Sequence, residues 1–336
     1  MSMFFCSDHS REIQEDIIGS ANYYQAYILI ECPQPWAYNA LESKWVPENL
    51  QLLAQEIKYN RLPIKLLLIS DNESHRREEK SLLIYQREHE FANHYRKHEF
   101  KLKKIEEVAL IIRKWLWLGD TSDEITSEVT RDILVCTHGS HDKCCSRYGN
   151  PFFYAASALI SDLKLQHIKI WKSSHFGGHR FAPTAIDLSD GRYYGRLDIE
   201  AFREILLRVG SVELFQRVYR GWSILPPPLQ VLERELILSH GWDWFDYKIM
   251  GRISEQNQNN SLMLGEISFE TTDGYHYLHQ AQITCDESKT VTVKGSCNAS
   301  KESLILKYSL ASSGSESLVI PKYVRLGHPE VLKTAS

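Results

Sequence analysis

The residues with the clearest metal-binding chemistry in this sequence are cysteines and histidines gathered between positions 136 and 179. Cys136 and the adjacent pair Cys144 and Cys145 come first. His175 and His179 follow, four residues apart in a glycine-rich segment. Thiolate sulfur and imidazole nitrogen are ligands of both zinc and iron. No other stretch of the sequence places so many ligand types so close together, so we expect a metal centre here.

The ligand types leave two kinds of centre open, a structural zinc ion and a [2Fe–2S] cluster with histidines on one iron. Zinc knuckles usually have cysteines about two to four residues apart, whereas eight residues separate Cys136 from Cys145. The segment from His175 to His179 is a poor helix former and lacks the glutamate of the HExxH metalloprotease motif. A Rieske centre is excluded, because its loops each pair a cysteine with a histidine on an all-β scaffold.

Predicted secondary structure brings these ligands to one place. The segments 132–136 and 166–171 are short apolar runs typical of buried strands, with a helix predicted at 151–163 between them. A strand, a helix and a second strand form a βαβ unit, whose two strands are parallel. The two ligand-bearing loops then leave the same carboxyl edge of the sheet, where α/β proteins place their sites.

The order strand, helix, strand, strand, strand, helix is predicted twice along the chain, which is the arrangement of thioredoxin-like folds. The first set is 26–31, 49–57, 64–69, 82–86, 99–103 and 105–117, and the second is 132–136, 151–163, 166–171, 180–188, 192–197 and 198–209. We therefore predict an α/β (α+β) fold, in which a ligand-free thioredoxin-like module precedes a thioredoxin-like ferredoxin domain. The expected domains are 1–125, 126–210 and 211–336.

The two ends of the chain differ from this pattern. Residues 1–19 are polar, and we expect an extended lead-in. After Gly210, two helices are predicted at 212–221 and 229–240, and alternating apolar and polar residues from Trp242 onward predict antiparallel strands. The third domain is thus expected to be a helical hairpin with a β-meander, serving as an accessory domain.

The motif VCTHGSHDKCCSRYG, followed by SSHFGGHRFAPTAIDLSDGRYYGRLD, resembles the sucrase/ferredoxin-like family. These are thioredoxin-like ferredoxins, and relatives among them carry bis-histidinyl [2Fe–2S] centres. The resemblance is specific over about residues 130–200 and looser over 20–130, and YRGWSILPPPLQVLEREL resembles extensions of bacterial members. It implies Cys136, Cys145, His175 and His179 as ligands of a [2Fe–2S] cluster, with Cys144 as the alternative to Cys145.

The expected function is electron transfer by this cluster, with reduction coupled to proton uptake at the histidine ligands. The alternative is a structural Cys2His2 zinc site in an interaction protein. A thiol–disulfide enzyme using Cys144 and Cys145 is disfavoured, because that chemistry requires a Cys-x-x-Cys motif. Sucrase activity is not supported, since nothing marks a carboxylate pair as acid and nucleophile. We expect an electron carrier rather than a catalyst.

Neighbours of the ligands are expected to support the cluster. Gly177 and Gly178 suggest close approach of backbone, whose N–H groups can bind sulfide. Arg180 is a candidate charge-assisted donor to a reduced cluster or, equally, a surface strand residue. His138 and His141 are expected to be solvated or to lie outside the ligand shell.

Composition excludes several classes of partner. The 336 residues carry a net charge of −4, so a nucleic-acid binder is not expected. No secretory signal and no apolar run of the roughly 20 residues that span a membrane are found. Clustered cysteines then fit metal binding in a reducing cytoplasm. The partner is expected to be a redox protein of unknown identity, and no nucleotide-binding motif is present.

Overall fold

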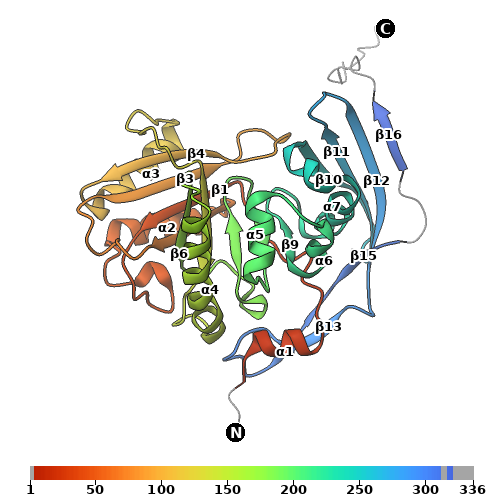
Figure 1. The fold of residues 1–336 in the computed structure, drawn as a ribbon, viewed down its shortest axis with the longest axis horizontal. Coiled ribbons are helices and arrows are strands. Elements are labelled where there is room, and N and C mark those ends of the chain that lie inside the picture. Colours follow the sequence, from red (N-terminus) through yellow and green to blue (C-terminus); the bar gives the residue numbers. More distant parts are fainter. Residues whose placement is uncertain (1–3, 312–315, 321–336) are drawn as a thin grey trace, which may run out of the picture.

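A nine-stranded mixed sheet organises the computed structural model, which describes residues 4–311 and 316–320 (Figure 1). Its strands lie in the order β4-β3-β1-β2-β6-β5-β7-β8-β9. Along the chain they are β1 (Ala26–Glu31), β2 (Ile64–Ser70), β3 (Lys80–Gln86), β4 (Arg96–Leu102), β5 (Arg131–Cys136), β6 (Ile168–Ser173), β7 (Ala185–Asp187), β8 (Arg192–Tyr194) and β9 (Tyr219–Trp222). The predicted mixed α/β class is confirmed.

The sheet consists of two halves with the same strand order. In the first half-sheet (β1–β4), β1 is parallel to β2 and β3 is antiparallel to β1 and β4. In the second half-sheet (β5–β8), β5 is parallel to β6 and β7 is antiparallel to β5 and β8. The halves join where β2 and β6 run antiparallel, with Ile69 opposite Ser173. Domain limits at 125 and 210 stay a prediction, and β9 continues the second half-sheet beyond residue 210.

Two helices accompany each half-sheet, because an apolar sheet face must be covered. They are α2 (Glu48–Tyr59) and α3 (Val108–Leu118) in the first half, and α4 (Lys143–Asp162) and α5 (Ile199–Leu207) in the second. Side chains alternate between the two faces of a strand. Accordingly Ile28 and Ile30 of β1 pack with α2 and α3, whereas Tyr27 and Leu29 belong to the larger core shared with the second half.

The C-terminal region adds a second sheet that packs on the first through a helix. α7 (Pro227–His240) contacts β9 and also the strands of this sheet, whose order is β10-β11-β12-β15, with β16 pairing β12. The strands are β10 (Lys248–Gln256), β11 (Leu262–Glu270), β12 (His276–Cys285), β15 (Tyr308–Leu310) and β16 (Glu316–Ile320), and a separate hairpin consists of β13 (Val291–Lys294) and β14 (Glu302–Ile305). The end of the predicted third domain, 321–336, lies outside the described residues.

Several sequence-based boundaries were wrong, among them that of the strand predicted at 192–197, which ends at Tyr194. Residues 6–12 form a helix, α1 (Cys6–Glu12), in place of the expected lead-in, and α4 begins at Lys143, eight residues before the predicted start at Pro151. The segment 212–221 is helical only to Val218, through η4 (Val212–Leu214) and α6 (Phe215–Val218), before it becomes β9. Pairing with β8 overrides the local helical periodicity there. Only Ala185–Asp187 of the strand predicted at 180–188 is extended.

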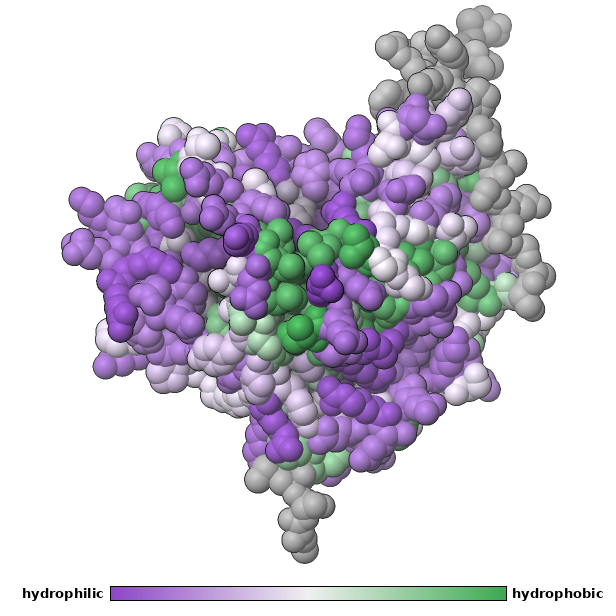
Figure 2. Space-filling view, in the orientation of Figure 1, coloured by the Kyte–Doolittle hydropathy of each residue, from purple (hydrophilic) through white to green (hydrophobic). Residues whose placement is uncertain are grey.

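Short 3-10 turns complete the described fold, namely η1 (Ala40–Glu42), η2 (Ile105–Glu107), η3 (His179–Phe181) and η5 (Gly241–Asp246). Hydrophilic residues cover most of the face shown in Figure 2, with a hydrophobic patch near its centre, over α5. Leu207 at the end of α5 and Val209 just after it are exposed. Among the described residues, no helix combines the length and apolar content needed to cross a membrane.

Candidate metal centre

The two predicted cysteine ligands lie at the carboxyl end of β5, an inner strand of the second half-sheet. Cys136 is the last residue of β5, and Cys145 lies in the first turn of α4. The helix begins here because the Asp142 side chain accepts a hydrogen bond from the backbone N–H of Cys144, at 2.8 Å. Both thiols are buried. The N-terminus of a helix carries partial positive charge, which favours a thiolate at this position.

The two predicted histidine ligands follow β6, the parallel neighbour of β5. His175 Nδ1 lies 3.6 Å from the Cys136 sulfur and 3.5 Å from the Cys145 sulfur. His179 Nδ1 lies 3.3 Å from His175 Nε2. The four side chains therefore form a row from a buried thiol pair to an imidazole pair nearer the surface, where the His179 side chain is 16% exposed.

The structure places Cys144 away from this row. Its sulfur lies 3.6 Å from that of Cys6 and 3.2 Å from that of Cys297, whereas Cys145 faces Cys136 and His175. Successive residues of a helix point in directions about 100° apart, which explains why the neighbouring cysteines diverge. Of the two, Cys145 is thus the one that lies with Cys136 and His175.

The pKa shifts of Cys136 and of both imidazoles favour the forms that bind metal, whereas the shift of Cys145 is in the opposite direction. Burial raises the pKa of Cys136, but hydrogen bonds from the Cys145 thiol and from backbone N–H groups outweigh it and lower that pKa overall. The pKa of Cys145 is raised by its bond to Cys136 and by burial. Burial and the neighbouring imidazoles lower the pKa of His175, and burial is also the main cause of the lowered pKa of His179. Neutral imidazole is the form that binds metal.

Two further histidines surround His175. His138 is buried, accepts a hydrogen bond from the His175 backbone N–H at 3.1 Å, and donates one to the Ala37 carbonyl at 2.7 Å. His138 thus positions the backbone of His175. The His141 ring stacks on that of His175, with centroids 4.1 Å apart, and groups with His175 and His179 as a set of three imidazoles.

The glycines between the histidines make room for a buried arginine. Gly177 and Gly178 have φ of +98° and +80°, a conformation that glycine adopts without strain. A Cβ at Gly178 would lie 2.4 Å from the guanidinium carbon of Arg220, and Arg220 donates to the Gly177 carbonyl at 3.1 Å. Arg220 is buried and lowers the pKa of Cys136 by its charge. In the described structure, these two glycines therefore contact the cationic side chain of Arg220.

Arg180 lies in a different network. Its guanidinium makes two hydrogen bonds to the buried carboxylate of Glu15, at 2.8 and 3.1 Å. Lys307 also bonds Glu15, at 3.0 Å. Arg180 therefore ties the histidine loop to the N-terminal segment, and Arg220 occupies the role of nearby cation that the sequence suggested for Arg180.

Sequence reasoning missed Arg220 and the backbone of residue 295. The His179 Nε2 hydrogen-bonds to the Gly295 carbonyl, 116 residues away. Arg220 lies in β9, within a segment whose local pattern predicted a helix. No spacing signal connects either position to the cysteine and histidine motifs, because strand pairing and loop packing bring them together.

The part of the chain that matches a known protein family includes the candidate centre. A model of the sucrase/ferredoxin-like family matches residues 17–221, more than half of the chain. The matched range contains both half-sheets and all four predicted ligands, and it ends within β9, before the C-terminal sheet. Searches of curated proteins and of solved structures find no match.

Proposed function

Because this chain belongs to the sucrase/ferredoxin-like family, we propose that it is an electron-transfer protein carrying a [2Fe–2S] cluster. The proposed ligands are Cys136, Cys145, His175 and His179. The observation that supports this assignment is the row of side chains, in which both thiols lie at the buried end and both imidazoles at the outer end. That separation suits a cluster with thiolates on one iron and imidazoles on the other.

The cluster would supply a one-electron couple, and the chain's own residues would adjust its charge. Two neutral imidazoles in place of two thiolates make the centre less negative, which raises its reduction potential. The charge of Arg220 and the partial positive charge at the N-terminus of α4 both stabilise thiolate at the buried end of the row. The imidazole end is nearer the surface, so it is the side from which a partner reaches the centre.

A two-iron centre requires a change in the position of His175. Thiolate and imidazole on one zinc ion, with bonds of about 2.3 and 2.1 Å, lie about 3.6 Å apart. The observed distances from His175 Nδ1 to the sulfurs of Cys145 and Cys136, 3.5 and 3.6 Å, match this value. His175 therefore lies closer to the thiols than a ligand of a second iron would. Its loop contains Gly177 and Gly178, which permit the backbone adjustment.

That same spacing favours a second candidate function, a structural zinc site formed by Cys136, Cys145 and His175. One experiment separates the two candidates. The full-length protein is purified anaerobically, reconstituted, and measured for iron, sulfide and zinc and by visible and EPR spectroscopy before and after dithionite. We expect a brown protein with about two iron and two sulfide per chain. A colourless protein with one zinc on this centre contradicts the cluster.

The proposed histidine ligands predict a potential that depends on pH. Each ligating ring keeps one nitrogen away from the metal, so reduction is expected to be coupled to proton uptake there. His175→Cys and His179→Cys should each retain a cluster, lower its potential by roughly 100 mV or more, and flatten its pH dependence. Protein-film voltammetry from pH 6 to 9 measures both quantities. An unchanged potential in either variant excludes that histidine as a ligand.

We propose carrier function rather than glycoside hydrolysis, despite the word sucrase in the family description. Hydrolysis uses a pair of carboxyl groups, one of them able to give a proton. The carboxylate beside the described centre, Asp142, accepts hydrogen bonds from the N–H groups of Cys144 and Cys297 and has a lowered pKa. We further propose a redox protein as partner and a cytoplasmic location, with no role for nucleic acid or membrane.

A further inference from the structure

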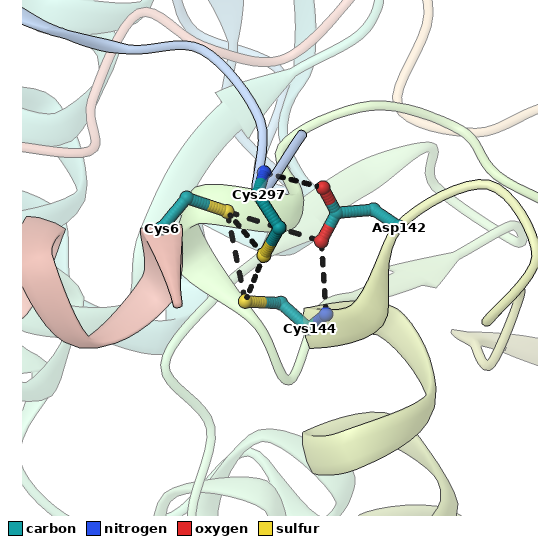
Figure 3. Close-up of side chains that lie close together, drawn as sticks. All are labelled: Cys6, Asp142, Cys144 and Cys297. Atoms are coloured by element: carbon teal, nitrogen blue, oxygen red, sulfur yellow. Dashed lines mark hydrogen bonds between the residues drawn. The ribbon is translucent and has the colours of Figure 1, made fainter. Parts of the chain in front are cut away.

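A second group of sulfur ligands lies beside the candidate centre (Figure 3). The sulfur of Cys144 is 3.6 Å from that of Cys6 and 3.2 Å from that of Cys297, and the sulfurs of Cys6 and Cys297 are 3.6 Å apart. All three cysteines are free. They come from α1, from the first turn of α4 and from the loop after β13, so only the tertiary structure brings them together.

Asp142 completes the group as a fixed carboxylate. Its Oδ1 accepts from the Cys144 N–H at 2.8 Å, and its Oδ2 accepts from the Cys297 N–H at 2.9 Å. Oδ1 also lies 3.9 Å from the Cys6 sulfur. One ligand atom from each of the four residues lies within 4.8 Å of every other. Each carboxylate oxygen has two lone pairs, so these hydrogen bonds leave capacity for a metal ion.

We propose that Cys6, Cys144, Cys297 and Asp142 bind one zinc ion in a closed tetrahedral site. Three thiolates on one zinc, with bonds of about 2.3 Å, lie about 3.8 Å apart. The observed separations of 3.2 to 3.6 Å approach this value. Four protein ligands leave no open position, which is the form of structural rather than catalytic zinc sites.

Other uses of the three sulfurs fit less well. A disulfide has an S–S distance of about 2.05 Å and joins two cysteines, whereas three thiols converge here. An iron–sulfur cluster spreads its cysteines over several irons, whereas all three sulfurs here lie within 3.6 Å of one another, which fits ligands of one metal ion. Three of the four residues are buried, and the negative charge of thiolates and a carboxylate in such a place calls for a bound cation.

The site connects segments outside the matched family range to the candidate centre. Cys6 and Cys297 both lie outside residues 17–221. Figure 1 places α1 beside β13, and the loop after β13 also supplies the Gly295 carbonyl that His179 contacts. Zinc would therefore fix the N-terminal helix and this C-terminal loop against the histidine end of the centre. The proposed zinc site uses none of the four residues proposed as cluster ligands.

Metal analysis of the full-length protein and of single variants tests the zinc site. We expect one zinc per chain in the wild type, and its loss in Cys6→Ser and Cys297→Ser while the iron content stays unchanged. Cys285→Ser, a control at the end of β12 in the same C-terminal sheet, should retain zinc. Cys136→Ser should lose iron and retain zinc. Wild-type protein without zinc overturns the proposal, as does zinc that persists in Cys297→Ser or disappears in Cys136→Ser.

A spectroscopic measurement on folded wild type avoids dependence on variants that fail to fold. Zinc is exchanged for Co²⁺, and X-ray absorption at the zinc edge is recorded on the unexchanged protein. We expect tetrahedral d–d bands, thiolate-to-cobalt charge-transfer bands, and a zinc shell of three sulfurs and one oxygen. A shell of two sulfurs with imidazole nitrogen would assign the zinc to Cys136, Cys145 and His175 and overturn the proposal.

Discussion

The two half-sheets have the same strand order but carry different chemistry at matching positions. β1 and β5 are the parallel-paired strands of the two halves; β1 ends at Glu31 and β5 at Cys136. The partner strands β2 and β6 are followed by Asp71 and by the loop that contains His175. The edge that carries carboxylates in the first half thus carries sulfur and imidazole in the second.

In the first half-sheet, the carboxylates at the carboxyl ends of β1 and β2 form ion pairs. Glu31 is buried and lies 2.5 Å from Arg77, which also pairs with Asp71. Lys169 of β6 lies 3.4 Å from Asp71. These carboxylates have cationic partners within the protein, whereas the thiols and imidazoles of the second half contact mainly one another. One strand arrangement can therefore hold either a self-neutralised polar cluster or a set of metal ligands.

The largest expected difference between the halves is in metal content. Cys136→Ser removes a proposed ligand at the end of β5 and should reduce iron from about two per chain to nearly none. Cys32→Ser alters the buried cysteine just after β1 and should leave the iron content unchanged. Iron and sulfide analysis with visible spectra measures both. Iron lost equally in the two variants would remove the distinction between the half-sheets.

The second difference is the close packing of α4 against β5. A Cβ at Gly149 would lie 2.0 Å from the Cys136 carbonyl oxygen, and α2 of the first half contains no glycine. Gly149→Ala should lower the free energy of unfolding by about 3 kcal/mol, because backbone or helix must shift. Ser157→Ala in the same helix should change it by less than about 0.5 kcal/mol. Chemical denaturation compares them, and equal effects would contradict this packing constraint.

A buried carboxylic acid lies beside β9, at the outer edge of the large sheet. Glu233 of α7 accepts hydrogen bonds from Tyr219 and lies 3.5 Å from Arg192. Burial raises the pKa of Glu233 from 4.5 to about 7, despite the opposing charge of Arg192. The folded state therefore retains a proton that the unfolded state releases, so this stabilisation is complete below pH 4.5 and is lost as the pH rises through 7.

The expected loss in the free energy of unfolding between pH 5 and pH 7 is about 2 kcal/mol. Glu233→Gln cannot titrate, so its stability should vary less over this range, whatever its absolute value. Urea denaturation at several pH values measures the slope. Parallel slopes for wild type and variant would show that Glu233 has an ordinary pKa.

The smallest expected effect comes from the ion pairs of the first half. Arg77→Met leaves the buried carboxylate of Glu31 without its cation and should lower the free energy of unfolding by about 1 kcal/mol, since Arg77 is partly exposed. Arg76→Met removes an exposed arginine next to it and should have almost no effect. Both variants should bind iron normally. A loss of iron in Arg77→Met would show that the first half also supports the centre.

Much of the sheet could be predicted because its signals are local. The runs at 26–31 and 132–136 are apolar over a strand's length, and the observed strands β1 and β5 have nearly those limits. Asp198 begins the segment predicted as a helix at 198–209, and its side chain caps that helix by accepting a hydrogen bond from the Ala201 N–H. Two predictions were weaker. At β9, strand pairing overrides the local preference for helix, and at the start of α4 the cap formed by Asp142 was not recognised.

In the candidate centre, too, some features follow from local sequence and others only from the packing of the folded chain. The positions of the cysteines and histidines within residues 136–179, together with the expected parallel strands, were sufficient to predict that Cys136 lies near His175, as observed. The choice between Cys144 and Cys145 as ligand came from a family resemblance and stays a prediction; the two side chains point from α4 to different groups of residues.

The amino-acid sequence alone determined which residue types are available as ligands and which short segments form the strands that carry them, since both depend on neighbours in the chain. The tertiary structure alone placed Arg220 behind the histidine loop and joined Cys6, Cys144 and Cys297 across 291 residues. Such contacts form between distant surfaces that pack together, so no local pattern encodes them. Residues 136–179 therefore predicted one candidate metal site, and the fold brings together the side chains of a second, proposed site beside it.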